Sequence, residues 1–352
     1  MFVLFCSPIS MMKQAIKSVD FPKSLADFLT KYLPAERGMS NNTIASYRIT
    51  FILLITFMEE YKGIKPQKLA FSDLTKACIV DFLNHLEQVR KCSVSTRNVR
   101  LAALHTFFKF VQYEWPEQLE ECRNILSIKV KKAQRGTINY LSVEGIRLLL
   151  SQPDLTTRQG IRDLALLALM YDTGARVQEI IDLTPEDIRL DKPCTIKLIG
   201  KGNKARIVPL MDAEVVHLRN YMAKNRLLET HAGTYPLFYN TRREKLTRAG
   251  ITHILHKYAT MARDSNKLLI PEKISCHSLR HSKAMHLLQA GVNLVYIRDI
   301  LGHISVTTTE VYARVDSKQK REAIEKAYVN VVDKEVPIWV NNESLLDWLK
   351  NF

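Results

Sequence analysis

The sequence lacks the cysteine patterns that hold small domains together. Its six cysteines stand far apart, and no two occur at the CxxC or CxxxxC spacing of common zinc modules. They form no closely spaced set of the kind found in small secreted domains, which indicates reduced thiols in a cytosolic protein. Also missing are any run of ~18 apolar residues and any internal repeat of roughly 20–50 residues. These absences argue against a zinc module, a disulfide scaffold, a membrane-spanning protein and a solenoid.

Acidic residues are scarce relative to basic ones. The 352 residues include 36 Asp or Glu and 51 Lys or Arg, which gives a net charge of +15. A fold does not require this excess, which attracts polyanions and makes nucleic acid the first candidate partner. A merely solvated basic surface would give the same count. Hydrophobic residues at 46% and charged residues at 25% are typical of a globular chain, and the length predicts about two domains.

The first residues form an apolar segment without a basic leading region. Residues 1–10 read MFVLFCSPIS, and Met11 and Met12 follow them. The missing basic region argues against a secretory signal peptide. We therefore interpret residues 1–20 as an N-terminal extension, with translation starting at Met1 or at one of the two later methionines. The expected location is the cytoplasm of a prokaryote, in association with the nucleoid.

Residues 21–122 are predicted to form a compact helical domain. Apolar residues recur at helical spacing in four segments, which are 24–33, 41–61, 72–90 and 93–115. Thr43 or one of the two Asn before it is expected to cap the second segment, Ser72 is expected to cap the third, and Pro116 should stop the fourth. Residues 123–139 then form a basic linker that contains Lys131 and Lys132.

The pattern changes in residues 140–330, which we predict to be a second domain, mostly helical with a small β-sheet. A helix over 141–150 begins after Ser142, and 161–171 is apolar nearly all round, as in a buried helix. Residues 195–210 predict a β-hairpin, because two β-rich arms flank a Gly/Asn turn. Several further helices are expected to about residue 327. The last segment, 331–352, is predicted to be a tail with an amphipathic helix.

Four short motifs in this half carry candidate chemistry. Each alone is a weak signal, because an Arg at a turn or a Lys in a hairpin is usually solvated. His277 and His281 stand four residues apart on one predicted helix face, a spacing that zinc can use, but a third ligand and an HExxH glutamate are missing. The motifs are GARVQE (174–179), GKGNKARIVPL (200–210), HSLRH (277–281) and LGHISVTTTEVY (301–312).

Their order and spacing resemble the tyrosine recombinase (phage integrase) family, in a Xer-like or mobile-element form. The resemblance covers roughly residues 21–330 and is strongest over 160–316. It implies that 21–122 is similar to the family's SAM-like core-binding domain and 140–330 to its catalytic domain. Six polar residues match the family's catalytic set without substitution, namely Arg176, Lys201, His277, Arg280, His303 and the nucleophile Tyr312.

The resemblance implies metal-free and cofactor-free strand exchange, and the chemistry of these residues suits it. Arg176 and Arg280 can offer forked donors to the non-bridging oxygens of a phosphodiester, and His303 adds another donor. Tyrosine has a pKa near 10, so a base is needed, and His277 is the candidate. Lys201 can protonate the leaving 5′-oxygen. The product would be a 3′-phosphotyrosine, resolved through a Holliday junction without ATP.

Further residues are expected to support the site or contact DNA. Glu179 lies one helical turn from Arg176 and can orient it, although a plain surface ion pair is an alternative. His281 supports the HSLRH box or simply packs in the core. Phosphate contacts are expected to outnumber base contacts. The predicted DNA contacts are Arg97, Arg100, Lys131, Lys132, Lys204, Arg206, Arg242, Arg243, Thr247 and Arg248.

The expected partners are a double-stranded core recombination site and further copies of the chain in a synaptic tetramer, with an accessory DNA-bending factor as an additional candidate. Residues 337–352 carry too many apolar side chains for a free end. They are expected to dock on a neighbouring protomer or on their own domain. The alternative functions are a relaxing topoisomerase with the same tyrosine chemistry, a non-catalytic architectural protein, and a metal-dependent nuclease or transposase.

Overall fold

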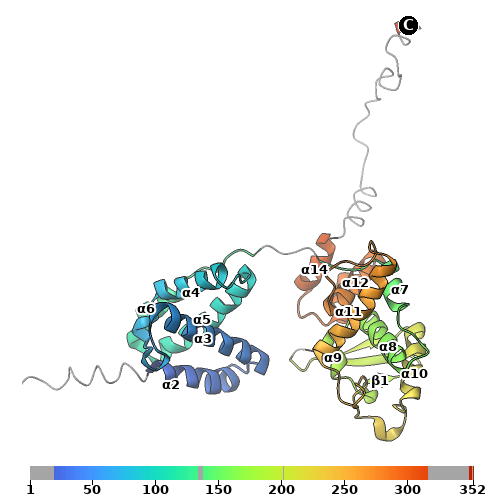
Figure 1. Cartoon of the computed structure of the whole chain (residues 1–352), viewed down its shortest axis with the longest axis horizontal. Coiled ribbons are helices and arrows are strands. Elements are labelled where there is room, and N and C mark those ends of the chain that lie inside the picture. The colour runs from blue at the N-terminus through green and yellow to red at the C-terminus, as the bar shows by residue number, and fades with distance from the viewer. Residues whose placement is uncertain (1–19, 134–137, 201, 316–348, 351) are drawn as a thin grey trace, which may run out of the picture. The chain divides into compact units, whose positions relative to one another are not determined.

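The computed structural model describes residues 20–133, 138–200, 202–315, 349–350 and 352, and it divides the chain into two units, 1–136 and 137–352. Figure 1 labels the helices and strands of each unit. Within the described residues, no helix has both the length and the apolar character needed to cross a membrane. The predicted class, mainly α with a small β-sheet, is confirmed.

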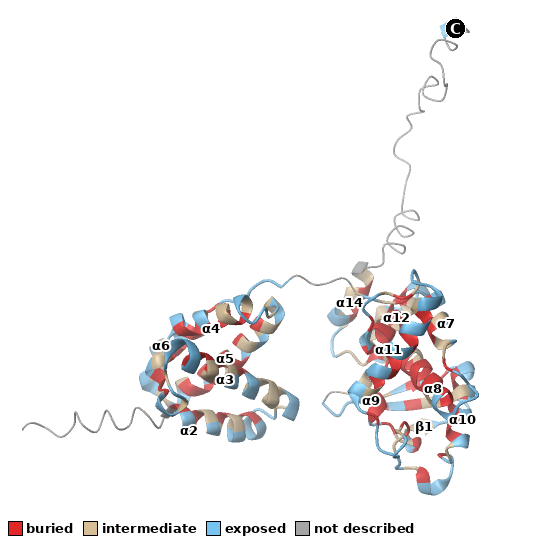
Figure 2. Cartoon of the chain, viewed as in Figure 1, coloured by how far each residue is buried: buried red, intermediate tan, exposed pale blue. Residues whose placement is uncertain are grey.

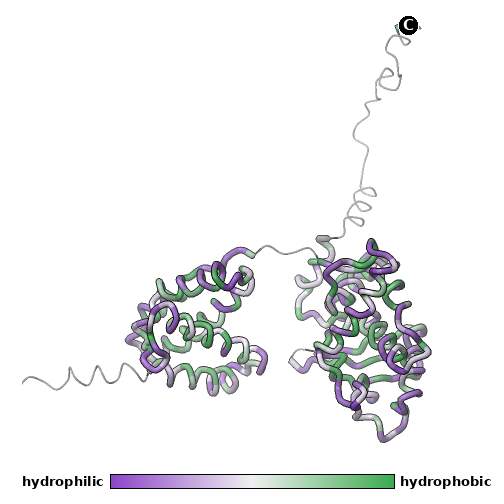
Figure 3. The backbone as a smooth tube through the Cα atoms, in the orientation of Figure 1, coloured by the Kyte–Doolittle hydropathy of each residue, from purple (hydrophilic) through white to green (hydrophobic). Residues whose placement is uncertain are grey.

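The N-terminal unit is a helical bundle around a phenylalanine-rich core. Phe28, Phe51 and Phe107 are fully or almost fully buried, and their rings meet edge to face. Figure 3 shows hydrophobic segments on the inner sides of α3 and α5. Short 3-10 turns lie at Pro66–Lys68, Phe71–Asp73 and Pro116–Gln118. The helices are α2 (Asp20–Asp27), continued by a π-helix (Phe28–Glu36), α3 (Asn41–Lys62), α4 (Lys76–Gln88), α5 (Val94–Glu114) and α6 (Leu119–Leu126).

Two predicted helix starts in this unit are wrong. Ser40, rather than Thr43 or an Asn, caps α3, because its hydroxyl accepts the Thr43 amide at 3.4 Å. Ser72 falls in a separate 3-10 turn, and Thr75 caps α4 instead. A capping side chain accepts a hydrogen bond from one of the free amides at a helix start. Tertiary packing decides where the helix starts, and therefore which of several neighbouring polar residues caps it.

The C-terminal unit combines further helices with one antiparallel three-stranded sheet. The helices are α7 (Val143–Leu150), α8 (Arg158–Thr173), α9 (Val177–Ile181), α10 (Asp212–Lys224), α11 (Arg248–Ser265), α12 (Cys276–Gln289), α13 (Leu294–Leu301) and α14 (Val306–Val315). The strands are β1 (Ile188–Arg189), β2 (Thr195–Ile199) and β3 (Ala205–Pro209), and 3-10 turns lie at Pro185–Asp187 and Thr230–Ala232.

Helix α8 forms the centre of this unit. It is buried along nearly its whole length, as its apolar composition predicts, and it packs against α10 and α12 (Figure 2). The predicted hairpin is confirmed as β2 and β3, with Ile196 opposite Val208. Gly174, with φ of 58°, ends α8 and turns the chain into the Arg176 segment. The end of α8, the hairpin and α12 thereby bring three of the sequence motifs together: GARVQE (174–179), GKGNKARIVPL (200–210) and HSLRH (277–281).

Several predicted features lie outside the described residues. They include the N-terminal extension up to residue 19, the centre of the basic linker at 134–137, Lys201, and 316–348, which holds most of the predicted tail helix.

Candidate active site

Tyr312 lies buried in a small core formed by α12, α13 and α14. Its side chain is 3% exposed. Its hydroxyl lies 2.9 Å from Nδ1 of His281, and its ring lies parallel to that of His303, with 6.5 Å between the ring centres. Burial raises the pKa of Tyr312, while Arg280 and Arg176 act in the opposite direction. The phenol is therefore neutral and hydrogen-bonded in this conformation.

The histidines around Tyr312 are poor proton binders. Burial, followed by the charges of its neighbours, lowers the pKa of His281 to about 4, and the same causes lower that of His303 to about 4. Burial and two arginines also lower the pKa of His277. Neutral imidazoles can accept a proton, so the surroundings keep potential bases available at neutral pH.

His281, and not His277, is the histidine that hydrogen-bonds Tyr312. The two rings are 6.0 Å apart on α12, as the four-residue spacing predicts. Local sequence pattern does not indicate which of the two histidines meets the tyrosine, because that depends on where α14 packs. Thr309 was missed entirely at the sequence level: it is fully buried, and its hydroxyl lies 2.9 Å from Nδ1 of His303. Its place one helical turn before Tyr312 was the available signal.

The His281 pKa makes the stability of this unit depend on pH. An unfolded histidine has a pKa near 6.5, so between pH 6.5 and about 4 the unfolded chain binds the extra proton. The stability that the unit has with a neutral His281 is therefore complete above pH 6.5 and is lost as pH falls towards 4. We expect the thermal midpoint of the full chain to fall over this range, and to fall less for His281→Gln. The exposed His231→Gln should follow the wild type, and equal falls in all three proteins would contradict the assignment.

Arg280 and Arg176 meet at the C-terminal end of α13. Arg280 is 3% exposed and donates from Nη1 to the carbonyl of Gly174 and from Nη2 to that of Leu301, both at 2.6 Å. Arg176 donates from Nη2 to the carbonyl of Gly302 at 3.2 Å, and its side chain remains 32% exposed. Burial and then Arg176 lower the pKa of Arg280 to about 10, so Arg280 remains a cation at neutral pH.

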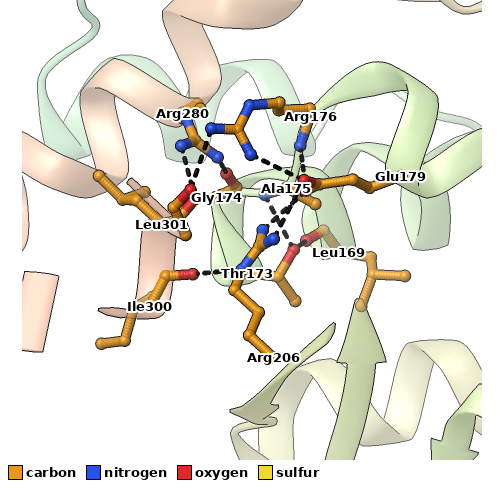
Figure 4. Close-up of polar contacts among 11 residues, drawn as sticks. Leu169, Thr173, Gly174, Ala175, Arg176, Glu179, Arg206, Arg280, Ile300 and Leu301 are labelled. Atoms are coloured by element: carbon orange, nitrogen blue, oxygen red, sulfur yellow. Dashed lines mark hydrogen bonds and ion pairs between the residues drawn. The ribbon is translucent and has the colours of Figure 1, made fainter. Parts of the chain in front are cut away.

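Glu179 holds two arginines at once. Its carboxylate accepts from Arg176 at 2.8 Å, and it accepts from both Nη atoms of Arg206 at 3.0 and 2.7 Å (Figure 4). Burial raises the pKa of Glu179, but the hydrogen bonds and charges of these two arginines outweigh it and hold the pKa below its ordinary value. Glu179 therefore makes a buried ion pair with Arg176, and the alternative of a plain surface pair does not fit its 3% side-chain exposure.

Two clefts open beside these arginines, and Arg176 lines both of them. One holds about 370 Å³ and lies between α9, α11 and α12, with His277 and Arg248 in its wall. The other holds about 570 Å³ and lies between the β2–β3 hairpin and the end of α13, with Lys204 and His303 in its wall. The unit thus presents cations and imidazoles on both sides of Arg176, a surface suited to an extended anion.

The predicted DNA contacts fall into two groups. Seven of the residues are exposed, namely Lys131, Lys132, Lys204, Arg242, Arg243, Thr247 and Arg248. Three arginines point into the protein instead. Arg97 is 4% exposed and donates to the Lys129 carbonyl, and Arg100 donates to the Ser46 carbonyl. With Arg206, these two use their guanidinium groups inside their own units, so we withdraw the three as phosphate contacts.

No group of three or more His, Cys, Asp or Glu side chains in the described part of the chain is arranged to hold a metal ion. His277 and His281 have no third ligand of these types among those residues. What the arrangement offers is a buried phenol, neutral imidazoles and clustered arginines, the set with which a tyrosine enzyme attacks a phosphodiester.

Comparison with known proteins agrees with this class. The model of the phage integrase family matches residues 139–319, and that of the phage integrase N-terminal SAM-like domain matches 26–114. Tyrosine recombinase XerD of Staphylococcus epidermidis is 34% identical over 294 residues, which cover 83% of this chain and 94% of the relative. The chain therefore belongs to the phage integrase family and is a tyrosine site-specific recombinase.

Solved structures share the fold. A XerH site-specific recombinase bound to difH substrate aligns with a TM-score of 0.63 at 23% identity, covering 85% of this chain and 84% of that one. The integrase of transposon Tn1549, in complex with transposon right end DNA, aligns with a TM-score of 0.63 at 16% identity, covering 86% and 98%. The fold of this chain is thus shared with these two solved structures.

Proposed function

We propose that this tyrosine recombinase cleaves one strand of a double-stranded core site by attack of Tyr312 on the scissile phosphorus. The phenolic oxygen becomes bonded to the 3′-phosphate, and the bond to the 5′-oxygen breaks. The product is a 3′-phosphotyrosine and a 5′-hydroxyl. A 5′-hydroxyl of another strand reverses the step, so the bond energy is conserved. The main observation in support of this proposal is that Tyr312 lies between two neutral histidines, His281 and His303, close to the arginines at the end of α13.

Arg176 and Arg280 are proposed to stabilise the charge on the non-bridging oxygens. Attack adds negative charge there, and fixed guanidinium donors outside bulk water stabilise it without reorganising. Arg176 is proposed to meet the phosphate first, because it is partly exposed and lines both clefts. His303 is proposed as a further donor from the second cleft.

The phenolic proton needs an acceptor. His281 is the histidine within hydrogen-bond distance of the hydroxyl, and its low pKa keeps it unprotonated. His277, the base expected from the family resemblance, lines the neighbouring cleft and remains a prediction for the DNA-bound enzyme. Lys201 lies outside the described residues, so its proposed role as proton donor to the leaving 5′-oxygen rests on the resemblance alone.

The proposed partners are duplex DNA and further copies of the chain. The net charge of +15 favours a polyanion, and the XerH and Tn1549 proteins named above are bound to DNA. The seven exposed residues named above are proposed as its contacts, with residues 21–122 as the core-binding domain. A synaptic tetramer, in which residues 337–352 dock on a neighbour, is proposed from the resemblance and the apolar tail.

The test is capture of the covalent intermediate. The full chain is incubated in EDTA with end-labelled duplexes from the DNA flanking its gene, each carrying a nick near the candidate cleavage point. Diffusion of the short 5′-hydroxyl fragment prevents reversal. We expect a labelled protein–DNA band on a denaturing gel, with the nucleotide attached to the peptide that contains Tyr312. The proposal would be contradicted if the protein bound the duplexes but formed no covalent band with any of them. Attachment of the DNA to a different tyrosine would contradict it as well.

A further inference from the structure

The last two residues of α13 and the Gly302 that caps it accept hydrogen bonds from three arginines. Three consecutive carbonyls are used, and each arginine comes from a different element (Figure 4). A helix end has unpaired carbonyls and a partial negative charge, so cations are stabilised there. The pairs are Ile300 with Nε of Arg206 at 2.8 Å, Leu301 with Nη2 of Arg280 at 2.6 Å, and Gly302 with Nη2 of Arg176 at 3.2 Å.

Every hydrogen bond recorded for Arg206 is internal, as it is for Arg280, and both side chains are less exposed than that of Arg176. In Arg206, Nη1 and Nη2 reach the two oxygens of Glu179, Nε reaches the Ile300 carbonyl, and the side chain is only 11% exposed. Its five N–H donors are therefore largely committed within the unit. Arg176, by contrast, remains 32% exposed at the cleft.

Gly302 makes room for Arg206. A Cβ atom at this position would lie 2.9 Å from Nη1 of Arg206 and 3.0 Å from its Cδ. The residue also has φ of 64°, a backbone conformation that favours glycine. The guanidinium of Arg206 therefore packs directly against Gly302. The carbonyl of Gly302 accepts from Arg176, and His303 is the next residue.

Glu179 completes the connection. Its two oxygens are shared between Arg176 and Arg206, and the carboxylate is also tied to the Arg176 backbone because Oε2 accepts the Arg176 amide at 2.8 Å. Without Arg206, each carboxylate oxygen would keep only its hydrogen bond from Arg176, so Glu179 and Arg176 could rotate together. A reacting group displaced by about 1 Å can lose about 10²-fold in rate.

We propose that Arg206 is a positioning residue for strand cleavage. It joins the β2–β3 hairpin to Glu179 and to the end of α13, and so fixes Arg176 and His303 at the cleft without touching DNA. The inference deepens the proposed function, because it rests on the proposed role of Arg176 at the phosphate.

The main test separates positioning from DNA contact. Arg206→Gln is compared with the wild type for the single-turnover rate of cleavage at saturating DNA and for the dissociation constant at several salt concentrations. We expect a rate about 10²-fold lower, with unchanged affinity and salt slope. A phosphate contact would instead weaken binding and reduce the slope of log K against log salt by about 0.9, and that result would overturn the proposal. Lys197→Gln, which removes an exposed charge from β2, should keep the wild-type rate.

A second variant approaches the same contact without removing charge. Gly302→Ala inserts the Cβ that collides with Arg206, and it should lower the rate at saturating DNA to a similar degree. Combined with Arg206→Gln it should cost little more than the worse single change, because both act on one contact. Fully additive losses would overturn the proposal. Circular dichroism shows whether each variant is folded at the assay temperature.

A modified substrate tests which step is affected. A 5′-bridging phosphorothiolate has a thiolate leaving group, which needs no proton. If Arg206 acts through Arg176 on the non-bridging oxygens, this substrate leaves the defect of Arg206→Gln unchanged. Full rescue would assign the defect to leaving-group protonation and overturn the proposal. If the wild type forms no adduct on any DNA it binds, the proposed function fails, which is a separate outcome from a fully active Arg206→Gln.

Discussion

Replacing Tyr312 by phenylalanine is expected to abolish the covalent protein–DNA adduct. The ring would still fill the space between α12, α13 and α14, where Tyr312 is 3% exposed. Only the hydroxyl is lost, and with it the nucleophile, so the cleavage rate should fall by about 10⁴-fold or more. Affinity for DNA should be unchanged, because the buried hydroxyl bonds to His281 rather than facing the clefts. The measurements are the trapped adduct on a denaturing gel and DNA binding by gel shift.

Tyr171→Phe provides a matched control within the same unit. The Tyr171 hydroxyl lies 2.9 Å from Nδ1 of His286, which repeats the Tyr312–His281 contact from another position on α12. Each variant leaves one ring nitrogen without its partner, at a cost of about 1 kcal/mol in the free energy of unfolding. Tyr171→Phe should retain the adduct. An adduct that survives in Tyr312→Phe would show that a different residue is the nucleophile.

In the proposed reaction, the phenol has to leave its present setting. In the described conformation it is buried, and its raised pKa disfavours the phenolate that the proposed attack requires. Arg280 and Arg176 act against burial on this pKa, so theirs are the charges proposed to activate the phenol. Exposing the phenol requires α14 to move away from α12 and α13, against which it packs through a small core.

The sequence predicted features that depend on local pattern. The buried α8, the β2–β3 hairpin and the four motifs follow from apolar periodicity and turn residues, which act over a few positions. Strand β1 is not predicted because two residues carry no alternation, and α6 is not predicted because the four helical segments of the domain end at Pro116. Ser72 was a plausible cap, but the 3-10 turn at Phe71–Asp73 removed it from the helix start.

The site depends on contacts that local pattern does not encode. Arg206 and Ile300 stand 94 positions apart, and Arg206 and Glu179 stand 27 positions apart, both beyond the reach of a local pattern. An arginine beside a Gly/Asn turn is usually solvated, which is why Arg206 was predicted to contact DNA. Only the packing of β3 against the end of α13 places it inside. The same reason explains Arg97 and Arg100, which α5 turns towards the main-chain carbonyls of their own unit.

Arg280→Lys is expected to lower the cleavage rate at saturating DNA by about 10²–10³-fold. The guanidinium spans two carbonyls, those of Gly174 and Leu301, each at 2.6 Å. A single ammonium cannot reproduce this planar fork, so at least one carbonyl loses its donor at a cost of ~1–3 kcal/mol. Arg219→Lys is the matched control, because that exposed arginine also donates to a carbonyl, that of Leu190, but on α10.

The pH dependence of this variant gives a second, independent readout. Burial and Arg176 already lower the pKa of Arg280 to about 10. A lysine begins from about 10.4, far below arginine, and the same surroundings would bring its pKa towards neutrality. The introduced ammonium should therefore lose its charge as pH rises from about 7 to 9, and the variant should lose activity while the wild type keeps its cation. A constant ratio of the two rates over this range would show that position 280 supplies geometry but not charge to the reaction.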